Sequence, residues 1–181
     1  CVTQAGAQPF SSPVDRRVLE QQRKRLEKMI KPFLMERTKN PTISMEIENG
    51  KIRLRLAAMR FFDPASASLR PEAIAVLDAI AEELDASKQN IRVEGHTDDE
   101  PIRTTRFRSN WELLASRAAT VVSYLEQAHG IAPQRLVAAG MGAQNPLVSN
   151  DTPEHREMNR RIEVVLEIPP NDPRGYAPPA P

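Results

Sequence analysis

The chain has 181 residues, with 25 lysines and arginines against 24 aspartates and glutamates, and 40% of its residues are hydrophobic. That length suits one domain of ordinary size with extensions, and the balanced charge argues against a nucleic-acid-binding protein. No stretch of about 18 apolar residues is present, which predicts no membrane-spanning helix. The single cysteine, Cys1, excludes an internal disulfide and a cysteine zinc site.

Residues 1–41 are predicted to form an N-terminal linker that contains a basic helix. From Pro13 to Lys31 the apolar residues follow a helical spacing among many charges, and Pro32 is expected to break or kink the helix. The basic residues are either a solvated face or a surface attracted to anionic headgroups, at about 1 kcal/mol per residue. We expect the helix to dock on the domain or on a partner copy, and to be able to release, through four apolar residues: Leu26, Met29, Ile30 and Phe33.

Cys1 at the start of the chain has two interpretations. In one, the chain is a mature lipoprotein acylated at Cys1; in the other, it begins just beyond a membrane helix. Both attach the chain to a membrane: the outer membrane if Cys1 is lipidated, and the inner membrane if the preceding helix is that of a stator subunit.

A β-hairpin is predicted over residues 42–57. Asn49-Gly50 favours a two-residue turn of type I′, and pairing outward from it sets Glu48 opposite Lys51 and Ile47 opposite Ile52. Each charged pair then has opposite signs and each apolar pair shares one face, so the register is well specified.

The rest of the domain, up to residue 168, alternates helices and strands. Pro71 opens a predicted helix, 91–95 and 136–139 read as strands, and Thr152 caps a short helix that begins at Pro153. Residues 161–168 alternate apolar and polar side chains, which is typical of a half-buried strand. The expected fold is an α/β (α+β) sandwich, a mixed sheet with helices mainly on one face. The proline-rich residues 169–181 are predicted to be a disordered tail.

The stretch from Val93 to Arg117 carries the most chemistry. Ser109 and Glu112 form a capping box that starts a helix at Asn110, with Gly130 as its stop. Arg117 projects from the edge of that helix's apolar stripe, where a partly desolvated guanidinium needs a partner. An acid and an arginine at the rim of a sheet can receive a zwitterion, the acid taking the ammonium and the arginine the carboxylate. The alternative is a structural salt bridge between the helix and the loop upstream.

A metal or hydrolytic site is the competing interpretation of the same loop. Its candidate groups lie within five residues, namely His96, Asp98, Asp99 and Glu100. A catalytic zinc site usually needs three protein ligands, and neither of the other histidines completes an H-E-x-x-H spacing. We therefore predict no metal, no cofactor and no enzymatic activity, and place His96 as a packing residue beside Asp98.

Several separated motifs carry a family resemblance. They are FFDPASASLRPEA (61–73), VEGHTDDEPI (93–102), SNWELLASRA (109–118), GMGAQNPLVSN (140–150) and NRRIEVVLEI (159–168). In this order they resemble the OmpA-like peptidoglycan-binding domain over roughly residues 42–168. The SNWEL segment and the long loop before it are similar to the periplasmic region of the MotB flagellar stator proteins.

The resemblance implies noncovalent binding to peptidoglycan in the periplasm, through the diaminopimelate of the stem peptide. Asp98, beside Thr97, would accept the ammonium, and Arg117 would bind the carboxylate. The resemblance also places three further residues in the peptidoglycan-binding site: Asn110, Asn159 and Arg160. A MotB-like stator subunit that anchors to the wall is the first implied role, with a homodimer and a membrane-embedded stator partner. An outer-membrane lipoprotein that tethers the membrane to the wall is the alternative.

Overall fold

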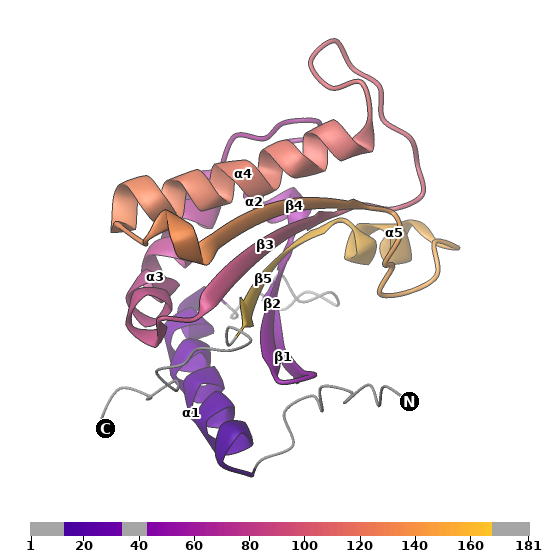
Figure 1. Cartoon of the computed structure of the whole chain (residues 1–181). Helices are drawn as coiled ribbons and strands as arrows, with labels where there is room; N and C mark the ends of the chain where they lie inside the picture. Colours follow the sequence, from indigo (N-terminus) through magenta and orange to yellow (C-terminus); the bar gives the residue numbers. More distant parts are fainter. Residues whose placement is uncertain (1–12, 34–42, 168–181) are drawn as a thin grey trace, which may run out of the picture.

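A computed structural model describes residues 13–33 and 43–167 of the chain, and its centre is a five-stranded sheet (Figure 1). The strand order is β1-β2-β5-β3-β4, in which β3 and β4 are parallel and the other neighbours are antiparallel. The strands are β1 Ile43–Glu48, β2 Lys51–Ala57, β3 Asn90–His96, β4 Leu136–Gly142 and β5 Arg161–Glu167. The helices are α1 Pro13–Ile30, η1 Lys31–Phe33, α2 Ala58–Phe61, α3 Pro71–Ser87, α4 Asn110–His129, η2 Pro133–Arg135 and α5 Pro153–Asn159. The predicted α/β fold with a mixed sheet is confirmed.

The β1–β2 hairpin has the predicted register, with Glu48 opposite Lys51 and Ile47 opposite Ile52. Asn49 and Gly50 both have positive φ, 51° and 72°, as a type I′ turn requires. The hairpin was predictable because the turn and the cross-strand pairs lie within a short stretch of sequence.

The prediction of a half-buried strand at 161–168 is wrong in one respect. The β5 strand lies between β2 and β3, and both of its faces are buried from Arg161 to Leu166. The polar residue Glu163 is buried because arginines of the neighbouring strand β2 pair with it: it accepts from Arg53 at 2.7 Å and from Arg55 at 3.3 Å. The alternation in β5 therefore separates an apolar buried face from a buried face whose charged side chains are paired, and not a buried face from an exposed one.

Helices α3 and α4 lie along one side of the sheet and enclose the hydrophobic core (Figure 1). The core side chains of these helices include Leu77, Ile80 and Leu84 from α3 and Val121 and Leu125 from α4. At the point where α4 crosses β3, a Cβ atom on Gly95 would lie 2.6 Å from the carbonyl oxygen of Leu114. A glycine at position 95 thus allows the close helix–strand approach that places the start of α4 beside the end of β3.

Helix α1 packs against the domain through apolar side chains that belong to the same core, Leu19, Leu26 and Ile30. Polar bonds reinforce the contact: Arg25 donates to Glu83 of α3 at 2.9 and 3.0 Å, and Gln22 donates to Gln89 at 2.7 Å. The predicted docking surface holds for Leu26 and Ile30, which are buried, and Phe33 packs beside them. Release of the helix and a domain boundary at residue 42 stay predictions.

No helix within residues 13–33 and 43–167 has the length and hydrophobicity of a membrane span. The predicted tail, residues 169–181, lies outside the described residues.

Candidate functional site

Asp98 follows the last residue of β3 by two positions and is almost fully buried, with 2% of its surface exposed. One carboxylate oxygen accepts a hydrogen bond from the backbone N–H of Glu100 at 2.9 Å, and the other forms an ion pair with Nη1 of Arg160. The Arg160 side chain is 40% exposed, so the ion pair reaches the protein surface on its arginine side. A carboxylate can accept more than two hydrogen bonds, so Asp98 retains capacity for an ammonium.

Arg117 is 7% exposed on the inner side of α4. Its Nε donates to the carbonyl oxygen of Ser66 at 2.7 Å, its Nη2 donates to that of Asp63 at 3.1 Å, and its Cζ lies 4.9 Å from the centre of the Phe62 ring. Burial lowers the pKa of Arg117 to about 10, so the guanidinium is still charged at neutral pH. Within the described part of the chain, no carboxylate forms an ion pair with it.

The predicted structural salt bridge between Arg117 and the loop of Asp98, Asp99 and Glu100 is not seen in the described residues. Asp98 pairs with Arg160, and Arg117 instead holds the turn at 62–66 through its carbonyl oxygens. These carbonyl partners were missed because no side-chain pattern marks them. The turn contains Ala65 with a positive φ of 51°, a conformation that its residue type does not predict.

Thr97 and Asn110 shape the loop around Asp98. The backbone N–H of Thr97 donates to the carbonyl oxygen of Gly142 at 3.2 Å, which ties the loop to the end of β4. The side-chain amide of Asn110, the first residue of α4, donates to the carbonyl oxygen of Glu100 at 2.9 Å. As predicted, Ser109 caps α4 by accepting from the N–H of Glu112, although the Glu112 carboxylate accepts from Arg108 and not from Ser109.

Asn159 is fully buried and its side-chain amide is saturated. The oxygen accepts from the backbone N–H groups of Leu147 and Val148, and the nitrogen donates to the carbonyl of Val148 and the side chain of Asn150. A ligand bond to this amide would require one of these bonds to break, so Asn159 acts on the site by positioning the loop 147–150.

Arg156 is a site residue that sequence reasoning missed. It donates to the carbonyl of Asn150 at 2.9 Å and lies 3.4 Å from a carboxylate oxygen of Glu100. It therefore connects the loop after β4 to the loop after β3, which contains Asp98. Its position three residues before Asn159 on α5 was the available signal, since residues three apart share a helix face.

The one tryptophan of the chain, Trp111, lies beside the end of β4, to which the Asp98 loop is bonded. It is 52% exposed, and its indole covers Gly142, where a Cβ atom would lie 2.9 Å from the ring. The Gly142 carbonyl also accepts from the N–H of Thr97, so Gly142 links the indole to the loop that contains Asp98.

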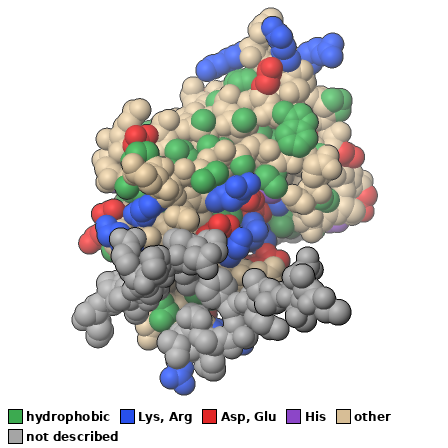
Figure 2. Space-filling model, viewed as in Figure 1, with side chains coloured by type: hydrophobic (Ala, Val, Ile, Leu, Met, Phe, Trp, Pro, Cys, Tyr) green, Lys and Arg blue, Asp and Glu red, His purple; other side chains and the backbone are tan. Residues whose placement is uncertain are grey.

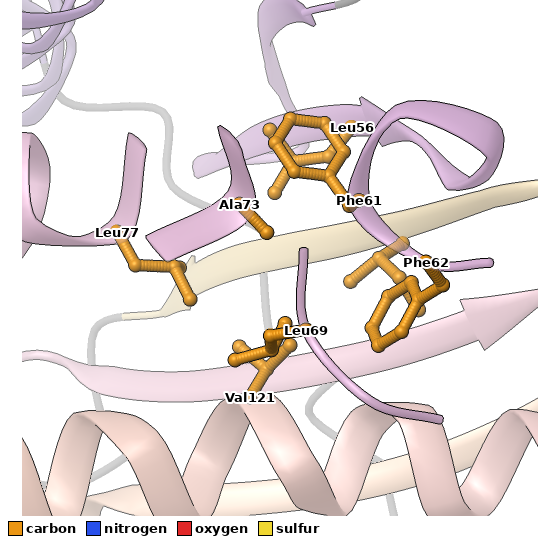
Figure 3. A pocket seen from close by; sticks show the side chains of 8 residues that line it. Leu56, Phe61, Phe62, Leu69, Ala73, Leu77 and Val121 are labelled. Atoms are coloured by element: carbon orange, nitrogen blue, oxygen red, sulfur yellow. The ribbon is translucent and has the colours of Figure 1, made fainter. Parts of the chain in front are cut away.

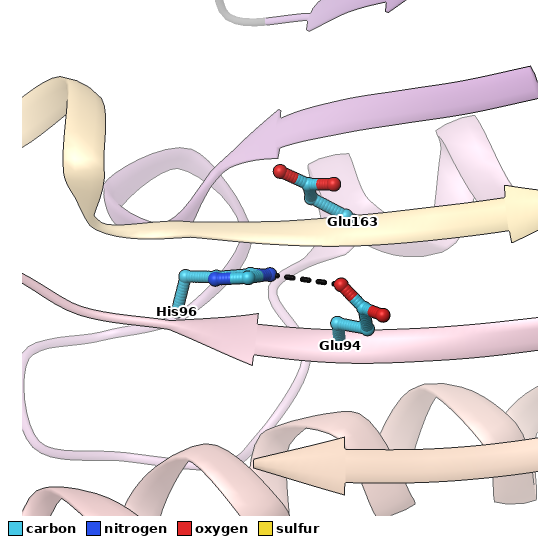
Figure 4. Close-up of side chains that lie close together, drawn as sticks. All are labelled: Glu94, His96 and Glu163. Atoms are coloured by element: carbon cyan, nitrogen blue, oxygen red, sulfur yellow. Dashed lines mark hydrogen bonds and ion pairs between the residues drawn. The ribbon is translucent and has the colours of Figure 1, made fainter. Parts of the chain in front are cut away.

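Glu94, His96 and Glu163 lie close together on one face of the sheet, with ligand atoms within 4.8 Å of one another (Figure 4). The His96 ring bonds to Glu94 at 3.1 Å, and that bond, with Arg92 and Arg53 nearby, lowers the pKa of Glu94 to about 2. Arginines also engage Glu163, so a bound cation would compete with charges that already neutralise both carboxylates. His96 therefore packs beside Glu94. Its predicted place beside Asp98 and the absence of a metal stay predictions.

A small pocket between α2, α3, α4 and the sheet is lined only by apolar side chains (Figure 3). Its lining includes Phe61, Phe62, Leu77 and Val121. With no polar group to orient a ligand, it is part of the core and carries no candidate site.

The model of the OmpA family matches residues 61–160, more than half of the chain. The chain belongs to the OmpA family. The matched region begins at Phe61 and ends at Arg160, so it contains Asp98, Arg117 and the loops that connect them.

Curated relatives of this OmpA-family chain include Motility protein B of Bacillus subtilis (strain 168), 31% identical over 164 residues, which are 90% of this chain and 59% of the relative. The Peptidoglycan-binding protein ArfA of Mycobacterium tuberculosis (strain ATCC 25618 / H37Rv) is 37% identical over 106 residues, 58% of this chain and 31% of the relative. The chain thus spans less than two thirds of the length of both.

Two solved structures are similar in fold. A putative MotB-like protein from Desulfovibrio vulgaris has a TM-score of 0.71 and 34% identity, covering 88% of this chain and 98% of its own. The cell wall anchor of the type VI secretion system (T6SS) from Pseudomonas aeruginosa has a TM-score of 0.70 and 30% identity, covering 80% and 97%. The resemblance of the sequence to the OmpA and MotB families is confirmed.

Proposed function

We propose that this chain binds peptidoglycan noncovalently and anchors a membrane-attached, MotB-like protein to the cell wall. The single observation that carries the proposal is Arg117, a charged guanidinium that is nine-tenths buried. Among residues 13–33 and 43–167 its partners are carbonyl oxygens and no carboxylate. A buried cation without a counter-charge is costly, and a carboxylate from a ligand would offset that cost. The names of the relatives, a peptidoglycan-binding protein and a cell wall anchor, support the same polymer.

The proposed ligand group is the diaminopimelate side chain, a zwitterion with a free ammonium and a free carboxylate. Nε and one N–H of Nη2 are occupied on Arg117, which leaves the other donors of its fork for the carboxylate. Asp98 would take the ammonium, which must share the carboxylate with Arg160 or displace it. The Arg160 side chain is 40% exposed, so it has room to turn away or toward the ligand.

Thr97, Asn110 and Asn159 enter the proposal as residues that hold the loops in place. Each bonds to backbone groups of the loops that flank Asp98, and none is proposed to change its bonds when ligand binds. The proposed role is binding without catalysis.

The location follows as part of the proposal: the periplasm, attached to the inner membrane as in a stator subunit. A homodimer and a membrane-embedded partner subunit are further parts of it, drawn from the likeness to Motility protein B. Sedimentation equilibrium of the purified chain tests the dimer, and a purely monomeric species at micromolar concentration would contradict it.

Cosedimentation with purified peptidoglycan sacculi tests the binding. Arg117→Ala and Asp98→Ala should each abolish pelleting with the wall while the protein stays folded. Arg135→Ala is a matched control, because Arg135 is also a mostly buried arginine that donates to backbone carbonyls, those of Gln89, Asp85 and Leu84, and burial also lowers its pKa.

Both arginine variants should lose about 1–3 kcal/mol of unfolding free energy, since each leaves carbonyl groups without donors. Only the Arg117 variant should lose binding to sacculi. A folded Arg117→Ala protein that still pellets with sacculi would refute the assignment.

A further inference from the structure

The loop between Asp98 and α4 carries a cluster of positive charge that the proposed stem-peptide site does not use. Arg103, Arg106 and Arg108 are all exposed, and residues 101–109 contain no acidic side chain. The loop projects from the end of the molecule opposite α1 (Figure 1), and Figure 2 shows basic side chains gathered on it. We call residues 101–109 the arginine loop.

The arginine loop has a defined conformation. Phe107 is 5% exposed and packs with Ala67 and Leu113 in a small apolar cluster that Ile102 joins. Thr104 donates its N–H to the carbonyl of Phe107 at 2.8 Å and accepts the Phe107 N–H on its hydroxyl at 3.0 Å. The middle of the loop is therefore anchored, while its three arginines are exposed.

None of the three arginine side chains forms an ion pair with any residue in 13–33 or 43–167. Arg106 lies over the Phe107 ring, with its Cζ 5.4 Å from the ring centre, and Glu112 accepts from the backbone of Arg108 and not from its guanidinium. The sheet arginines Arg53 and Arg55 differ, because each of them pairs with glutamates. Three like charges held near one another without counter-charge attract an external anion.

The position of the loop limits what that anion is. It begins directly after Asp98, Asp99 and Glu100, and it ends at Asn110, which bonds back to the carbonyl of Glu100. A polymer whose side chain reaches Asp98 therefore runs close to the arginine loop. Resting on the proposed function, we propose that the arginine loop binds further carboxylates of the same wall polymer, on stem peptides next to the one held by Asp98 and Arg117.

Exposed ion pairs are individually weak and are screened by salt. Several of them on one polymer act together, so their loss should weaken polymer binding by roughly tenfold at low salt and have little effect at high salt. A single free diaminopimelate molecule cannot reach the additional carboxylates, so its affinity should not depend on the loop.

The experiment compares the triple variant Arg103→Gln, Arg106→Gln, Arg108→Gln with a control of equal charge change, Lys24→Gln, Lys28→Gln, Lys31→Gln. The control lysines are exposed and lie on α1 and η1, away from the loop. Binding to sacculi at about 50 and 500 mM salt is measured by cosedimentation, spanning the range over which surface charges become screened. Binding to free diaminopimelate is measured by calorimetry.

We expect the arginine-loop variant to bind sacculi about tenfold more weakly than wild type at low salt only. It should bind diaminopimelate normally, and the lysine control should match wild type in both. At low salt, wild type and Arg117→Ala should both bind poly-L-glutamate, and the loop variant should not. This result distinguishes failure of the arginine loop from failure of the stem-peptide site.

Equal binding of sacculi by wild type and the loop variant would overturn the proposal. So would loop-dependent binding to vesicles of anionic phospholipid together with loop-independent binding to sacculi, which would assign the loop to a membrane.

Discussion

Arginine side chains in this domain have two kinds of environment. Those on the sheet, such as Arg53 and Arg161, pair with the carboxylates of Glu94 and Glu163. Arg117 and Arg135 are enclosed by the fold and donate to backbone carbonyls, and burial lowers the pKa of both. Arg135 also lies 3.5 Å from the Asp85 carboxylate, whereas Arg117 has no such partner in the described residues. That difference is why Arg117 is proposed to meet a ligand anion.

Trp111 provides a spectroscopic prediction at the residue scale. Its half-exposed indole lies on Gly142, whose carbonyl accepts from Thr97 next to Asp98. Ligand binding at Asp98 should change the solvent contact of the indole, so diaminopimelate should alter the tryptophan emission of wild type. Cadaverine, which has ammonium groups but no carboxylate, serves as the control at the same concentrations. If diaminopimelate displaced the protein from sacculi but left the emission unchanged, Trp111 would not adjoin the site.

Glu94 supports a pH prediction. Its pKa is lowered from 4.5 to about 2 in the folded state, first by the bond to His96 and then by Arg92. A depressed carboxylate pKa stabilises the fold above the unfolded pKa, and this contribution is lost as pH falls from about 4.5 to about 2. Wild type should therefore lose more stability across that window than Glu94→Gln does.

At neutral pH, Glu94→Gln should lower the unfolding free energy by about 2 kcal/mol, because two arginines and His96 lose a charged partner. Denaturant unfolding measured from pH 7 to pH 2 provides the comparison. Glu126→Gln, at an exposed position on α4, is the control and should follow wild type. Parallel curves for wild type and Glu94→Gln would show that Glu94 does not contribute in this way.

At the scale of elements, prediction from sequence succeeded where the determinants are local. The hairpin register followed from Asn49-Gly50, and the bounds of α4 followed from Ser109 and Gly130. Prediction failed for the burial of β5, because its polar face is buried by arginines that lie about a hundred residues away in the chain.

The candidate site divides in the same way. Asp98 and Arg117 were predicted to be important from their places on a loop and a helix. The partners they have in the structure, Arg160 and the carbonyls of Asp63 and Ser66, lie more than fifty residues away. Such contacts depend on the order of the strands, which the local patterns do not specify.

Helix α1 supports a prediction about the domain boundary. Deleting residues 1–41 should leave peptidoglycan binding intact, since the loops around Asp98 lie at the other end of the molecule (Figure 1). The deletion should still lower the melting temperature, because Leu19, Leu26 and Ile30 leave the core and Arg25 leaves Glu83.

Leu26→Ala in the full chain is the matched comparison and should cost about 2–5 kcal/mol of unfolding free energy. Circular dichroism and cosedimentation report fold and binding. A truncated chain that cannot fold would make α1 part of the domain and would contradict the prediction that α1 can release from it.

At the scale of the whole molecule, the groups proposed to bind the wall gather at one end. The Asp98 loop, the arginine loop and the start of α4 lie together there, and α1 lies at the opposite end (Figure 1). This polarity suits a protein that contacts the wall on one side and a membrane attachment on the other.

The central claim, that Asp98 and Arg117 together receive a zwitterion, is tested most directly by calorimetric titration with three small molecules. Diaminopimelate carries both charges, pimelate carries only carboxylates, and cadaverine carries only ammonium groups. Wild type should bind diaminopimelate, and Arg117→Ala should bind it about 10–100-fold more weakly through loss of a charge-assisted bond. Neither pimelate nor cadaverine should bind wild type with an affinity close to that of diaminopimelate. Equal affinity of wild type for pimelate and diaminopimelate, or no binding of diaminopimelate at all, would contradict the account.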